Sequence, residues 1–443
     1  MEGHLFGLPS ESHVKIPRMA TAGVAAAACL VAGVTGVAVA QTPSHPSVVS
    51  TDPSNFTPHL ADDNTGTRPR VLALGKIGNT LYAGGMFHNI LDRRRQNMVQ
   101  RENLFSFDIP TGDISSFAPV VNGPVWSIVT TNDAVYIGGE FTSVNGVDRR
   151  GIAKLNPTTG EVDTAFQSPF GSGRVTEMAM ANGRLIVAGS FPRKIIALNP
   201  TTGRGTTYIT AAVTGTVPLS NEKTNVFKFA VDPSATHLVA VGNFTTVDGQ
   251  QRVRAFMLDL GQTSTSLNPW WYSQFANRCA STTPARQSYL DDVDFSPDGS
   301  YFVVAATGFV PQFSSQIGTM VCDAAARFET DVASPTAPTW INYTGGDTLH
   351  SIVATGAAVY VQGHSRWLDN PQGRDSAGPG ALSRPGGGAI DPETGDALSW
   401  NPVMSNSVGG FDFLATSDGL WLGRDGNRIG GEFHRGLAFM PLS

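Results

Sequence analysis

The second repeat of this chain reads Val135-Tyr136-Ile137-Gly138-Gly139, an apolar run that ends in glycine. A fixed period of about 50–65 residues separates its copies, and periods in this range are typical of propellers, solenoids and arrays. The repeat therefore predicts the fold, although it does not name a ligand. Two close copies lie at residues 81–85 and 185–189, and weaker copies lie at 238–242, 302–308, 359–363 and 420–423.

The residues around this repeat predict four antiparallel strands. A turn at Asn132-Asp133 follows the first strand, and the tight turn Pro157-Thr158-Thr159-Gly160 joins the third strand to the fourth. Proline fixes φ in such a turn and glycine supplies a positive φ. Four antiparallel strands are the content of one propeller blade. The expected strands cover residues 125–129, 134–138, 150–156 and 161–166.

The chain ends predict how the blades form a ring. The last unit stops after residues 436–440 and lacks a fourth strand, whereas residues 54–58 resemble the fourth-strand segment 115–119. We therefore expect an all-β fold, a seven-bladed β-propeller of four-stranded antiparallel blades, closed by an N-terminal strand. Closure would protect sheet edges that invite aggregation. Counts of six or eight blades stay open because the fifth and sixth units carry long insertions.

The N-terminus predicts export. Lys15 and Arg18 precede an apolar stretch over residues 19–40 that ends in Ala38-Val39-Ala40, an A-x-A cleavage signal. We expect a signal peptide at 1–40, a Pro/Ser-rich spacer at 41–49 and a single propeller domain at 50–443. An uncleaved membrane anchor is the alternative, since the stretch is long enough to span a bilayer. The expected location is secreted or associated with the cell envelope.

The cysteines agree with export. Only Cys279 and Cys322 remain after cleavage, and an even pair in an oxidising compartment predicts a disulfide. We expect it to tie the loop before one strand to a later strand of the same blade. Closing a loop of this length stabilises a protein by on the order of 4 kcal/mol.

Residues 138–166 also carry a family resemblance. Gly138-Gly139-Glu140-Phe141, followed by Thr142-Ser143-Val144-Asn145-Gly146, resembles the delta-60 repeat of secreted bacterial β-propellers. Residues 241–249 are a second good match and residues 84–87 a partial third, whereas the C-terminal half departs from the pattern. The resemblance implies an exported propeller and brings no catalytic residues with it.

The densest polar cluster is the long loop after the second strand of the sixth unit. Long loops with aromatic and hydrogen-bonding residues suit a ligand, with Trp367 stacking on a sugar while Arg366 and Asp369 bind its hydroxyls. The alternative is that the arginine and aspartate side chains pair with each other and that Trp367 packs between blades. The ligand-binding candidates are His364, Arg366, Trp367, Asp369, Asn370 and Arg384, joined by His434 and Arg435 if the last unit faces the same opening.

Other acidic motifs give weaker signals. Asp291 and Asp292 lie on a predicted strand, where alternation sends them to opposite faces, so we expect solvated or capping roles for them and for Asp294. Asp425 and Asn427 resemble the start of a calcium loop, but the later ligands are missing. We expect no metal and no cofactor.

Function is the least determined property. We expect a binding module that presents rim loops to a glycan or protein partner, because no catalytic set is evident. The alternative is an extracellular carbohydrate-active enzyme, a hydrolase or lyase, with its site at the central channel; a purely structural surface protein is a third reading. The net charge of −6 argues against a nucleic-acid partner. We expect a monomer, with membrane contact only through an uncleaved leader.

Overall fold

The computed structural model describes residues 42–62, 66, 68–280, 283, 287–405 and 408–442. These residues belong to one unit, which extends from Val37 to Ser443. The predicted signal peptide, and with it Cys29, lies outside the described residues. Within the described ranges, no helix has the length and apolar character needed to cross a membrane.

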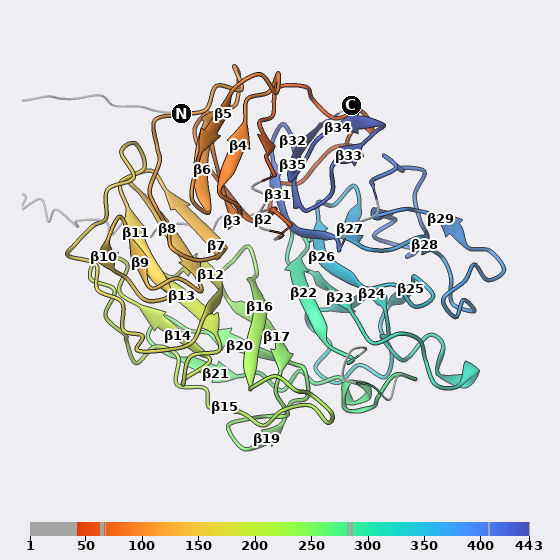
Figure 1. Ribbon diagram of the computed structural model, residues 1–443. Helices are drawn as coiled ribbons and strands as arrows, with labels where there is room; N and C mark the ends of the chain where they lie inside the picture. Colours follow the sequence, from red (N-terminus) through yellow and green to blue (C-terminus); the bar gives the residue numbers. More distant parts are fainter. Residues whose placement is uncertain are drawn as a thin grey trace, which may run out of the picture. The chain divides into compact units, whose positions relative to one another are not determined.

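Strands dominate the described residues, so the all-β prediction is confirmed. Two short 3-10 helices are the exceptions, η1 (Ser273–Ala276) and η3 (Ser314–Gln316). Seven sheets of three or four antiparallel strands repeat one plan, in which a first strand pairs with a second and the second pairs with a third (Figure 1). The first strands are β2 (Arg70–Ile77), β7 (Val125–Thr131), β12 (Val175–Ala181), β16 (Asn225–Val231), β22 (Leu290–Phe295), β26 (Leu349–Ala354) and β31 (Gly410–Thr416).

The second strands are the most buried because they lie in the middle of each sheet and carry the apolar repeat. In order they are β3 (Thr80–Met86), β8 (Ala134–Gly139), β13 (Arg184–Gly189), β17 (His237–Asn243), β23 (Tyr301–Ala306), β27 (Val359–Gly363) and β32 (Gly419–Arg424). The third strands are β6 (Leu104–Asp108), β11 (Ile152–Leu155), β14 (Ile195–Leu198), β20 (Ala255–Leu260), β24 (Ala324–Glu329), β30 (Gly387–Ile390) and β35 (Leu437–Pro441).

The fourth strand is shorter than the sequence predicts. Two sheets have one, β21 (Thr265–Leu267) and β25 (Trp340–Tyr343). In four others it shrinks to a single bridge, such as Leu155 with Val162. The aromatic residue of this segment nonetheless packs inward as expected: Phe166 is fully buried against Tyr136. Anchoring by one aromatic side chain thus replaces a ladder of hydrogen bonds.

Short hairpins and edge strands lie in segments that the sequence analysis treats as loops. One is β9 (Ser143–Val144) with β10 (Val147–Asp148), in which Asn145 and Gly146 have the positive φ of a tight turn. Two more pairs are β28 (Trp367–Leu368) with β29 (Leu382–Ser383) and β33 (Arg428–Ile429) with β34 (Glu432–Phe433). One small three-stranded sheet consists of β1 (His59–Leu60), β4 (Asn89–Leu91) and β5 (Met98–Gln100). Another consists of β15 (Val213–Thr214), β18 (Thr246–Val247) and β19 (Gln250–Gln251).

The disulfide prediction is confirmed. Cys279 and Cys322 are bonded, with Cα atoms 5.8 Å apart. Both cysteines are buried together with Met320. Cys279 lies in the segment before β22 and Cys322 just before β24 of the same sheet, so the bond joins two connecting segments and not, as the sequence analysis expects, a loop and a strand.

Every first strand carries a one-residue bulge at the same place. The register of β7 against β8, for example, shifts between Val125 and Ser127 and leaves Trp126 as the extra residue. A bulge turns a side chain out of the normal alternation and frequently lies beside a functional site. The seven extra residues are Leu72, Trp126, Thr176, Phe227, Asp291, His350 and Phe411.

Polar side chains of the first strands join neighbouring sheets. Asp292 and Asp294 of β22 accept hydrogen bonds of 2.9 Å from the backbone N–H groups of Ile352 and Ala354 on β26. In the same way Asp412 of β31 accepts one of 2.7 Å from Leu74 of β2. Asp292 and Asp294 are therefore structural acceptors, not the solvated or capping groups that the sequence predicts.

The N-terminal segment lies beside β35. Ser50 and Ser54 donate backbone hydrogen bonds to Pro441 and Phe439 at 2.7 and 2.9 Å, and Val49 bridges Leu442. Residues 50–58 do not form a regular strand, whereas the sequence analysis expects one at 54–58. Pro53 and Pro58 explain the difference, because proline has no N–H to donate to a ladder.

Candidate functional site

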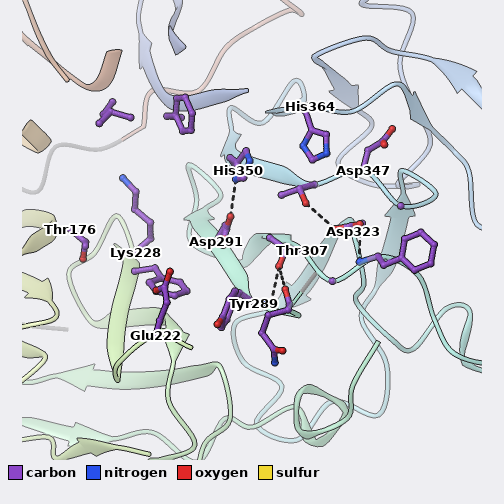
Figure 2. Close-up of a pocket in the computed structure, with 18 of the residues that line it drawn as sticks. Thr176, Glu222, Lys228, Tyr289, Asp291, Thr307, Asp323, Asp347, His350 and His364 are labelled. Carbon is purple, nitrogen blue, oxygen red and sulfur yellow. Dashed lines mark hydrogen bonds and ion pairs between the residues drawn. The ribbon is translucent and has the colours of Figure 1, made fainter. Parts of the chain in front are cut away.

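A pocket of about 850 Å³ lies where the seven bulges meet (Figure 2). All seven extra residues line it, one from each sheet. Its wall is completed by loop residues and by Lys228 of β16. These are Arg174, Glu222, Lys228, Gln287, Tyr289, Thr307, Gly308, Phe309, Asp323, Gly346, Asp347, Thr348, His364, Arg366 and Asp375.

One side of the pocket is aromatic and apolar. Trp126, Phe227 and Phe411 come from three different first strands and are half-buried, so their rings keep some exposed surface. The Arg174 guanidinium lies 5.5 Å from the centre of the Trp126 ring. Such rings offer flat faces to an apolar or partly apolar ligand.

The other side carries a histidine–aspartate pair. His350 Nδ1 lies 2.9 Å from Asp291 Oδ2, and both side chains are half-buried. The His350 ring also stacks on Phe411 at 5.7 Å and lies 6.2 Å from the His364 ring. The carboxylate fixes the orientation of the imidazole, so its other nitrogen is available to a ligand.

Arg366 is held by carboxylates in this part of the pocket. Its guanidinium donates to Asp347 at 2.7–3.1 Å in a bidentate arrangement and also donates to Asp375. These hydrogen bonds raise the pKa of Arg366. The arginine is therefore charged but already paired, which is the alternative that the sequence analysis left open.

Two other groups near Arg366 are biased toward their neutral forms. Burial lowers the pKa of His364, and His350 lowers it further. Burial raises the pKa of Asp323 to about 8, against the opposing hydrogen bond from the Phe309 N–H. Near neutral pH the pocket thus presents an uncharged imidazole and a carboxyl that retains its proton.

The pocket floor is a charged layer. Lys228 Nζ lies 2.5 Å from Glu177 Oε2, and the same lysine lines a second cavity of about 250 Å³ on the far side, together with Asp292 and Asp412. Burial opposes the charge on Lys228, but these carboxylates outweigh it and raise the pKa of the lysine. Lys228 therefore lies between the pocket and this second cavity, both of which are lined by residues of the first strands.

The predicted ligand residues divide into two groups. His364 and Arg366 line the pocket, whereas Trp367 lies under the Arg366 guanidinium at 4.3 Å and Asn370 is fully buried, bonded to the backbone of Thr344 and Ser376. Asp369 and Arg384 also have hydrogen-bond partners within the protein: the aspartate accepts from the Ala397 N–H, and the arginine donates to the Leu398 carbonyl.

His434 and Arg435 lie elsewhere. His434 is buried, with Nδ1 3.2 Å from the Thr57 hydroxyl, and its ring lies 5.8 Å from that of His59. Arg435 pairs with Asp62. Neither lines the pocket with His364, so the structure does not bring these two His/Arg pairs together.

The sequence pattern does not reveal most of the lining. It assigns Asp291 to a strand face and places Trp126 in a plain strand, and it does not single out Phe227, His350 or Phe411. A signal for them does exist: each is the second or third residue of its first strand, at the same place in every repeat.

No group of three or more His, Cys, Asp or Glu side chains is placed to hold a metal ion among the residues described. Asp425 of the calcium-like motif instead accepts hydrogen bonds from the backbone of Val408 and Gly409, and Arg68 approaches it at 3.5 Å. The donors around this carboxylate are cationic or N–H groups, which a metal would repel.

Comparison with known proteins identifies the fold. A family described as a domain of unknown function (DUF5122) beta-propeller matches residues 133–166. The crystal structure of the RRP9 WD40 repeats is similar at a TM-score of 0.50 and 10% identity, over 88% of this chain and 99% of that chain. The fold is a β-propeller. No curated protein matches the chain.

Proposed function

We propose that this propeller is an exported, non-catalytic binding module with seven blades, and that it takes a glycan into the pocket formed by the bulged residues. The blade count rests on the seven repeated sheets. Closure of the ring is supported by the Asp412–Leu74 hydrogen bond and by residues 49–54 beside β35. Export is supported by the A-x-A signal, the resemblance to the delta-60 repeat and the Cys279–Cys322 bond.

The observation that carries the proposal is the convergence of seven bulges on one pocket. A bulge interrupts strand pairing, so seven of them at equivalent places favour a common purpose. Three of the displaced side chains are aromatic and two form the Asp291–His350 pair. The fold thus presents aromatic faces and hydrogen-bonding groups to one space.

A glycan fits this chemistry better than a strongly charged ligand does. Sugar rings pack their C–H faces on aromatic rings and need donors and acceptors around their edges. The fixed charges on the polar side are paired internally, as in Arg366 with Asp347. A neutral polyol would not have to compete with these pairs.

A glycan array followed by calorimetry tests the proposal. We expect Phe227→Ala and Trp126→Ala to weaken binding of the array hit at least about tenfold, because central aromatic contacts dominate such interfaces. Phe313→Ala is the matched control, since Phe313 is 59% exposed and does not line the pocket. Absence of any glycan signal, or equal losses in the control, would refute the proposal.

The Asp291–His350 pair favours a second candidate, a carbohydrate-active enzyme. A histidine oriented by a carboxylate can act as a general base. To distinguish the two functions, the protein is incubated for a long time with the glycan that it binds on the array, and the glycan is then analysed for breakdown products. Turnover that disappears in His350→Ala would establish the enzyme, whereas recovery of intact glycan supports the binding module.

A further inference from the structure

A third cavity, of about 530 Å³, opens directly beside the pocket. The two spaces share Arg174 and Glu222, whose guanidinium and carboxylate lie 3.8 Å apart. Both side chains are accessible, at 30% and 54% exposed. A ligand that fills the pocket can therefore continue over this ion pair into the third cavity, which we call the side groove.

The side groove contains an amide without a partner. Asn225, the first residue of β16, lines the groove and is 2% exposed. Neither its Oδ1 nor its Nδ2 has a hydrogen-bond partner within the described structure. A buried polar group left unpaired costs stability, on the order of 1–3 kcal/mol. A ligand hydroxyl in the groove would supply the partner that this amide lacks.

Other unpaired polar atoms lie on the route between pocket and groove. The indole Nε1 of Trp126 and the Nε of Arg174 are buried and lack partners. Arg174 lies against the Trp126 ring and borders both spaces. These two unpaired donors thus lie where the pocket and the side groove adjoin.

We propose that the side groove is a second sugar subsite and that the ligand is a linear oligosaccharide with vicinal hydroxyls. A side-chain amide offers one acceptor and two donors, which matches two adjacent hydroxyl groups, each able to donate and accept. A secondary amide fits less well, because its N–H and C=O point in opposite directions. The inference rests on the proposed function, since it extends the same site.

Arrayed linear glucans, xylans, mannans and galactans of one to six sugars test the inference, with titration of each hit. We expect the dissociation constant to fall at least tenfold between the shortest bound sugar and the tetrasaccharide. Asn225→Leu should remove this gain while leaving binding of the shortest sugar unchanged. The variant should also unfold at the same or a higher temperature, because it removes an unpaired buried amide.

Two further variants keep the test decisive. Lys223→Ala, at the outer part of the groove, should also reduce the gain with chain length, and it serves if Asn225→Leu does not fold. Gln250→Leu makes the same amide-to-leucine change at an exposed site on β19 and should leave the gain intact. Length-independent affinity, or a gain that survives in Asn225→Leu, would overturn the subsite but not the pocket. Absence of binding to any arrayed sugar would overturn both.

Discussion

Asp294 shows how a single side chain joins two sheets. It accepts a hydrogen bond from the Ala354 N–H of the next first strand, yet it lies beside the second cavity, near Asp292. Burial, together with the nearby Asp292, raises the pKa of Asp294 to about 8 against the opposing backbone hydrogen bond from Ala354. The protonated form is thus the one that the folded protein prefers.

This preference predicts a pH dependence of stability. The carboxyl titrates near 4 in the unfolded chain and near 8 in the folded one, so its contribution is fully present below pH 4 and is lost as pH rises through 8. We expect the midpoint of thermal unfolding to fall between pH 6 and pH 9. In Asp294→Asn, which stays neutral, the fall should be smaller by roughly 2–4 °C.

The exposed Asp418 provides the matched control, because Asp418→Asn should follow the wild-type curve. Scanning calorimetry at half-unit pH steps makes the comparison. An identical slope in Asp294→Asn and wild type would show that this carboxyl does not govern the pH dependence.

Among the strands, the paired glycines of the repeat have two separate roles. A Cβ at Gly138 would meet Val175 of the neighbouring sheet at 2.6 Å, so this glycine lets two sheets approach. A Cβ at Gly139 would collide with the carbonyl oxygen of Pro124, at the start of the partner strand beside the bulge. These two contacts explain why the repeat ends in a pair of glycines.

Gly139→Ala should therefore destabilise the protein, by about 1–3 kcal/mol, because a backbone oxygen cannot move aside as a side chain can. Denaturant unfolding gives the change in free energy. Gly205→Ala is the control, since a Cβ there meets nothing within 4 Å and the residue has no positive φ. Equal stabilities of the two variants would contradict this account of the repeat.

The strands also show how much of the structure can be predicted from the sequence. Apolar runs and Pro-Gly turns predict the second and third strands because these are set by local pattern. The bulges were not predicted, since a stretch such as residues 125–129 reads as plain alternation until the partner strand is known. Arg366 could be placed in a polar loop, but its pairing with Asp347 depends on a segment that only the fold brings near.

For the whole molecule, the contacts of the N-terminal segment join the two ends of the chain. Besides its backbone bonds to β35, the Ser50 carbonyl accepts from the Trp400 indole at 3.0 Å. Phe56 packs on Trp421 and Phe439, with ring centres 5.8 Å away from each. The segment therefore covers the outer edge of the last sheet and fills the space next to it.

A chain that begins at Pro58 should lose this cover and expose the edge of β35. Exposed edge strands pair with other chains, so we expect a lower thermal midpoint together with self-association. Light scattering during heating measures both. A chain that begins at Thr42 keeps every contact of residues 49–56 and should behave as the full-length chain. If the two shortened chains unfold alike and remain monomeric, the N-terminal segment is a dispensable cover, and the first and last sheets must be held together by contacts between first strands such as Asp412 with Leu74.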